Sequence, residues 1–173
     1  MARISYVERE NAPENIQGVY DQLKQKFGVV PNVLKGMANS PELFMGFIPF
    51  LGAALGPSQV DNATKELAII TTSKLNGCSY CTAHHTAAGR RAGLSDEKIN
   101  AAPDETSDAF NDKEKAVVRY SRELAENVAA SQETLEELKK HFGEGQIAEL
   151  NLVNGVFHVL TRFADTFKIE LEK

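Results

Sequence analysis

The stretch GCSYCTAHH, residues 77–85, gathers two cysteines and two histidines within nine positions. Cys78 and Cys81 are the only cysteines in the chain of 173 residues. Two thiols at this spacing can be oxidised to a disulfide, and thiolates and imidazoles are also metal ligands. Redox chemistry, a metal site and a purely structural pair are therefore three interpretations of this segment.

Helical geometry would bring three of these side chains together. On a helix, Cys78, Cys81 and His85 stand at positions i, i+3 and i+7, which share one face. His84 lies one position earlier, about 100° around the helix. We therefore expect Cys78, Cys81 and His85 to form one site, and His84 to be a surface or packing residue.

Glu66 adds a carboxylate from the preceding segment. Asn76 and Gly77 interrupt the chain between Glu66 and the cysteines, so two helices can fold back as an antiparallel hairpin. At ~1.5 Å per residue, Glu66 lies ~15 Å from the turn and His85 lies ~10 to 12 Å from it. A glutamate side chain or a bridging water spans the difference, so we expect Glu66 and His85 to interact.

These four residues fit the chemistry of peroxide reduction. A thiolate must attack the O–O bond, the departing alkoxide needs a proton, and a second thiol must resolve the sulfenic acid as a disulfide. Cys78 and Cys81 supply the thiols, and the N-terminus of a helix favours the thiolate. His85, oriented by Glu66, supplies a path for protons. Helix position alone would make Cys78 the more acidic thiol.

The same residues resemble a known signature. A glutamate, 11 intervening residues, CxxC, three residues and a histidine resemble the motif of the AhpD-like alkylhydroperoxidases, within the carboxymuconolactone decarboxylase family. The matching residues are Glu66, Cys78, Cys81 and His85. The segment FGVVPNVLKGMANSPELF and the helix expected over residues 146–169 also resemble family segments, so the resemblance covers most of the chain.

The resemblance implies an all-helical fold, a trimer or hexamer, and peroxide reduction by the cysteine pair without haem or metal. It implies that peroxide attacks Cys81 and that Cys78 resolves the product, after which an unknown dithiol or protein reductant reopens the disulfide. Tyr80 stands where the best-studied members carry a histidine. Because the decarboxylases proper generally lack the cysteine pair, its presence argues against lactone decarboxylation.

Two further interpretations stay open. Cys78, Cys81, His85 and Glu66 could supply four zinc ligands, although zinc sites usually separate two ligand pairs by a loop, and three ligands on one short helix close a tetrahedron poorly. A thiol sensor or a disulfide carrier without peroxidase turnover would show the same four residues. Turnover of peroxide with a dithiol reductant separates the enzyme from the sensor.

The elements that must position these residues are helices. Apolar residues recur at helical spacing almost everywhere, and no run alternates with a period of two. We expect a single all-α domain over residues 1–173. Its expected helices include one ending at Gly28, one beginning at Pro41, one from Asp61 to Leu75, one from Ser79 to Arg91, one opened by a capping box of Asn111 and Glu114, one after Ser131, and one over residues 146–169.

Composition narrows the class of protein. The chain has 42% hydrophobic and 25% charged residues, as ordinary globular proteins do. Its net charge of -5 offers no basic surface for nucleic acid. Without a signal segment or an apolar run of about 18 residues, we expect a cytoplasmic protein without a membrane span. Several strongly apolar helices predict a homo-oligomer.

Overall fold

The computed structural model describes residues 1–172, and this part of the chain forms helices without a β-strand. The all-α expectation is confirmed. A 3-10 helix spans Arg9–Asn11. The α-helices are α1 (Glu14–Phe27), α2 (Asn32–Met37), α3 (Pro41–Leu55), α4 (Asn62–Leu75), α5 (Ser79–Arg91), α6 (Asp96–Ala101), α7 (Asp112–Asn127), α8 (Gln132–Lys139) and α9 (Glu144–Phe167). Within residues 1–172, none of these helices is both long and apolar enough to cross a bilayer.

Local signals in the sequence set most helix ends. The Asp61 side chain accepts a hydrogen bond of 2.9 Å from the Thr64 N–H at the start of α4. Asn111 and Glu114 form the expected capping box at the start of α7. At the end of α1, Gly28 adopts a φ of 80°, a conformation that glycine reaches without a steric penalty. The helix ends therefore follow from groups close in sequence.

Helix α4 is surrounded by other helices. Its consecutive residues Leu67, Ala68, Ile69 and Ile70 are all fully buried. They point in different directions, so they join three apolar clusters, which together include residues from every other α-helix. A helix that is apolar all round needs neighbours on every side. Glu66, which directly precedes this run, therefore stands on a rigid support.

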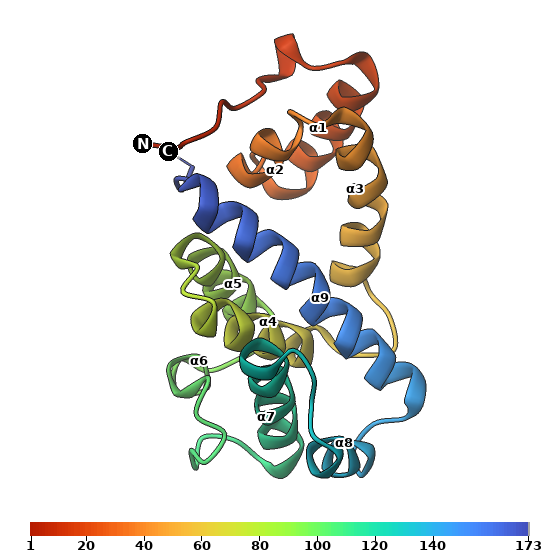
Figure 1. The fold of residues 1–173 in the computed structure, drawn as a ribbon, viewed down its shortest axis with the longest axis vertical. Coiled ribbons are helices and arrows are strands. Elements are labelled where there is room, and N and C mark those ends of the chain that lie inside the picture. Colours follow the sequence, from red (N-terminus) through yellow and green to blue (C-terminus); the bar gives the residue numbers. More distant parts are fainter. Residues whose placement is uncertain (173) are drawn as a thin grey trace.

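Helix α9 crosses the whole molecule in Figure 1, with α1–α3 on one side and α4 and α5 on the other. Its observed range, Glu144–Phe167, begins and ends two residues before the expected range of 146–169. The N-terminal segment runs beside the end of α9, where the Arg3 N–H donates to the Phe167 carbonyl at 2.7 Å. Beyond α9, Glu172 reaches α2, and its carboxylate accepts a hydrogen bond of 2.6 Å from the Asn32 N–H.

Candidate active site

A tight turn joins α4 to α5 and begins the site. Gly77 has a φ of 69°, and Cys78 is the N-cap residue of α5. The Asn76 side chain fixes this turn to α9, because its amide donates to Thr161 Oγ1 at 2.9 Å and lies 3.2 Å from His158 Nδ1. The expected hairpin is present, and α4 and α5 pack against each other.

The hairpin brings Glu66 and His85 into direct contact. The Glu66 Oε2 atom lies 2.7 Å from His85 Nδ1, and the two side chains are only 13% and 15% exposed. The ring of Phe157, on α9, meets the His85 ring edge to face at 4.5 Å between centroids. The imidazole is therefore held from two sides, and its Nε2 atom is left for other partners.

The two cysteines are buried free thiols in hydrogen-bond contact. The Cys78 sulfur accepts a hydrogen bond of 3.2 Å from the Cys81 backbone N–H. A hydrogen bond from the Cys81 thiol lowers the pKa of Cys78, although burial opposes this shift. The same bond, together with burial, raises the pKa of Cys81. Cys78 is therefore the more acidic thiol, as helix position predicts, and the proton of the pair stays on Cys81.

A cavity of about 390 Å³ adjoins this pair. Cys81, His84 and His85 all line it, whereas Cys78 is not among the described residues that do so. Most of the remaining wall is apolar and comes from α1, α2, α3 and α9, including Phe27, Val33, Leu34, Ile48, Leu51, Leu55, Phe157 and Leu160. Cys81 is thus the sulfur that a substrate in this cavity would meet first.

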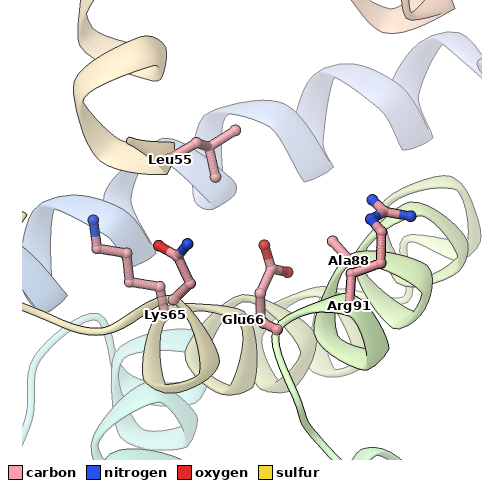
Figure 2. A pocket seen from close by; sticks show the side chains of 7 residues that line it. Leu55, Lys65, Glu66, Ala88 and Arg91 are labelled. Atoms are coloured by element: carbon pink, nitrogen blue, oxygen red, sulfur yellow. The ribbon is translucent and has the colours of Figure 1, made fainter. Parts of the chain in front are cut away.

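A smaller pocket of about 210 Å³ lies next to the cavity and shares Leu55, Ala88 and Arg91 with it. Figure 2 shows Glu66 from α4 and Arg91 from α5 along the floor of this pocket, with Leu55 from α3 above them. Glu66 therefore contacts His85, which lines the cavity, and also lines the smaller pocket itself.

His84, expected to be a surface or packing residue, is partly exposed and packs against a neighbouring ring. The His84 ring lines the cavity and lies 4.5 Å from the ring of Tyr80, and its Nε2 atom is 2.8 Å from Glu172 Oε2. Tyr80 and His84 are four residues apart on α5, a spacing that does predict contact. No sequence spacing predicts the contact of Glu172 with His84, because the position of Glu172 beside α5 depends on how α9 packs.

Comparison with known proteins identifies the segment that contains these residues. Residues 41–123 match the Carboxymuconolactone decarboxylase family. The matched segment spans slightly less than half of the chain. It includes Glu66, Cys78, Cys81 and His85. The chain is also 27% identical over 99 residues to the uncharacterized protein YdfG of Bacillus subtilis, an alignment that covers 56% of this chain and 67% of YdfG.

Solved structures show that the chain has an AhpD-like fold. The AhpD core, a peroxidase-related protein from Ralstonia eutropha, superposes with a TM-score of 0.88 at 20% identity, over 99% of this chain and 93% of that protein. A peroxidase-related protein from Silicibacter gives 0.85 at 20% identity, over 99% and 92%. The debrominase Bmp8, as a cysteine-to-alanine variant bound to 2,3,4-tribromopyrrole, gives 0.84 at 22% identity, over 98% and 91%.

The arrangement of the side chains at the site also concerns the zinc interpretation. Within residues 1–172, no group of three or more His, Cys, Asp or Glu side chains is arranged so that it could hold a metal ion. The Cys81 N–H donates to the Cys78 sulfur, and the Glu66 carboxylate contacts His85.

Proposed function

We propose that the protein is a thiol-dependent peroxidase that reduces peroxides through Cys78 and Cys81, with Glu66 and His85 as a proton relay. The observation that carries this proposal is the shared cavity. Cys81 and His85 line the same largely apolar cavity, and His85 is paired with Glu66 at 2.7 Å. A thiol, a base and a largely apolar cavity for an organic peroxide are thus adjacent.

The reaction begins with the proton between the two sulfurs. Ionisation of the pair leaves the thiolate on Cys78, the more acidic thiol, whereas the sulfur at the cavity is that of Cys81. Transfer of the Cys81 proton to Cys78 generates a thiolate at the cavity. This thiolate attacks the terminal peroxide oxygen, so an S–O bond forms, the O–O bond breaks and an alkoxide departs. Cys81 becomes a sulfenic acid.

The second step closes the disulfide. His85 takes the proton from Cys78, and the Cys78 thiolate attacks the Cys81 sulfenic acid. The S–S bond forms, and hydroxide leaves as water with the proton that His85 returns. The pair has then given two electrons to the peroxide, and an external dithiol or protein reductant must return them before another turnover. This chemistry requires no cofactor.

Peroxide consumption at substrate levels tests the proposal. Reduced protein treated with one equivalent of tert-butyl hydroperoxide should lose two hydrogens per chain in non-reducing mass spectrometry, and excess dithiol should sustain turnover. Cys81→Ser should abolish turnover. A disulfide that forms without dithiol-dependent turnover would favour the sensor or carrier. Tightly bound zinc that protects the thiols until a chelator is added would favour the metal site.

A second candidate function is reductive dehalogenation of an aromatic ring. The fold matches that of the debrominase Bmp8 bound to a brominated pyrrole, and the cavity beside Cys81 is large and apolar enough to hold a halogenated ring. The dithiol would supply two electrons and a proton to the carbon, releasing bromide and leaving a disulfide. Bromide release from a bromopyrrole, measured against peroxide consumption under the same conditions, distinguishes the two activities.

A further inference from the structure

A second pair of histidine and glutamate stands at the cavity, beside the pair formed by Glu66 and His85. His84 Nε2 lies 2.8 Å from Glu172 Oε2. The Glu172 side chain is only 14% exposed, whereas that of His84 is 36% exposed. His84 and His85 line the same cavity as Cys81. Two consecutive residues of α5 therefore line the cavity of Cys81, and each imidazole lies next to its own carboxylate.

Glu172 is held firmly in this position. Its Oε1 atom accepts hydrogen bonds from the Asn32 N–H at 2.6 Å and from the Tyr80 O–H at 2.8 Å, which leaves Oε2 for His84. Burial opposes ionisation, but these hydrogen bonds and the nearby His84 lower the pKa of Glu172. Burial and Glu172 raise the pKa of Tyr80, so Tyr80 stays a neutral donor. His84 is therefore the group of this cluster that can exchange a proton at the cavity.

The two pairs lead away from the cavity in different directions. Glu66 lines the small pocket of about 210 Å³ in Figure 2. Glu172 lines a separate pocket of about 520 Å³, whose wall includes residues of the N-terminal segment and α1. The imidazoles also use opposite nitrogens, because His85 contacts its carboxylate through Nδ1 and His84 through Nε2. The two pairs of histidine and glutamate thus join one cavity to two different pockets.

The attack on peroxide requires protons at two places. The sulfur end must exchange protons within the cysteine pair, while the departing oxygen becomes an alkoxide, a far stronger base than a thiolate. We propose that His84 is the general acid that protonates this alkoxide, and that Glu172 is a positioning residue that orients the His84 imidazolium. This inference rests on the proposed peroxidase function.

The step balances as follows. The Cys81 thiolate forms the S–O bond, and the electron pair of the O–O bond departs on the alkoxide oxygen. That oxygen takes the proton from the Nδ1 atom of His84, giving an alcohol, a Cys81 sulfenic acid and a neutral imidazole. His84 then regains a proton from water at its exposed edge. His85 is left free to accept the Cys78 proton in the next step.

Two oxidants separate this role from a structural one. The alkoxide released from tert-butyl hydroperoxide needs a proton, whereas the acetate released from peroxyacetic acid leaves without one. In single-turnover oxidation of the reduced protein, His84→Gln should react about 10²-fold more slowly with tert-butyl hydroperoxide but less than about twofold more slowly with peroxyacetic acid. Glu172→Gln should show the same selectivity, with a smaller loss. His141→Gln, which removes a partly buried histidine beyond the end of α8 and outside the cavity, should change neither rate.

Equal slowing of both oxidants in His84→Gln, or no slowing of either, would overturn the role of His84. Melting curves followed by circular dichroism establish that each variant is folded, and Glu172→Gln provides the same comparison if His84→Gln does not fold. Failure of the inference differs from failure of the peroxidase proposal. If the parent protein forms no disulfide with either oxidant, the peroxidase function itself is wrong.

Discussion

At the scale of single residues, the acidity of the two cysteines depends on one shared proton. The Cys81 thiol donates to the Cys78 sulfur, which lowers the pKa of Cys78 and raises that of Cys81. Cys81 nevertheless lines the cavity, and the family resemblance also assigns the attack to this residue. In the proposed reaction, the more acidic sulfur and the attacking sulfur are therefore different residues, connected by a short proton transfer.

This distribution of protons can be measured directly. Because the pKa of Cys78 is lowered, its thiolate should appear below the ordinary value of 9.0 as pH rises. Cys81→Ala removes the donor, so the midpoint of this titration should move to higher pH. Ultraviolet absorbance of the thiolate reports both midpoints. An unchanged midpoint in Cys81→Ala would show that the hydrogen bond between the thiols does not set the acidity.

The relay of Glu66 and His85 predicts a loss of rate without loss of fold. Glu66→Gln and His85→Gln should each slow oxidation of the thiols by peroxide about 10²-fold, the low end of general acid and base contributions. Cys78→Ser should stop at a sulfenic acid on Cys81 that a trapping reagent detects. If Glu66→Gln reacts as fast as the parent while its melting temperature falls, Glu66 has only a structural role.

At the scale of elements, a buried carboxylate joins α7 to α8. Glu123 accepts hydrogen bonds of 2.6 Å from both the Ser131 N–H and the Thr134 hydroxyl at the start of α8. Burial opposes ionisation of this carboxyl, but these hydrogen bonds outweigh it and lower the pKa of Glu123 to about 2. The N-terminus of α8 is thus stabilised by the negative charge of Glu123, which belongs to α7.

This contact predicts how stability depends on pH. The lowered pKa stabilises the folded protein above pH 4.5, the ordinary value for glutamate, and this contribution is lost as pH falls toward about 2. Glu123→Gln should lower the free energy of unfolding at neutral pH by about 2 kcal/mol. It should also remove part of the decline in stability on acidification. Urea unfolding at several pH values measures both effects, with the more exposed Glu126→Gln as the matched control.

At the scale of the whole molecule, we propose that the chain is one domain. Helix α4 contributes to all three apolar clusters, so neither half of the chain has a core of its own. Large apolar side chains nevertheless remain exposed on α3 and α9, among them Leu43, Phe50, Leu152 and Val159. On each helix the two residues are seven apart and share a face. This surface is a candidate interface between copies of the chain.

We therefore expect a homo-oligomer, a trimer or a hexamer by the family resemblance. Light scattering at micromolar concentration should give a mass well above the 19.0 kDa of one chain. Leu43→Glu together with Leu152→Glu should shift the mass toward the monomer, because a buried interface would then have to desolvate charges. Val128→Glu, at an exposed apolar residue on another element, should leave the mass unchanged. A clean monomer of the parent protein would contradict this expectation.

The sequence by itself determined the helices and the core of the site, because the interactions responsible are local. Caps such as Asp61 and Asn111 act within one turn, and helical spacing joins Cys78, Cys81 and His85 across two turns. A hairpin of adjacent helices then requires only one short turn to bring Glu66 to His85. The expected contact therefore depended on little beyond the length of each helix.

Only the tertiary structure decided which groups surround this core. The cavity is formed by side chains from α1, α2, α3, α5 and α9, and no periodicity in any one of them specifies its shape. Glu172 reaches Tyr80 and His84 because the packing of α9 carries the chain end past α5, a contact between residues about ninety positions apart. Local spacing predicts the side of its helix on which His84 lies. Its proposed role as a general acid depends on Glu172, which only the packing of distant helices brings close.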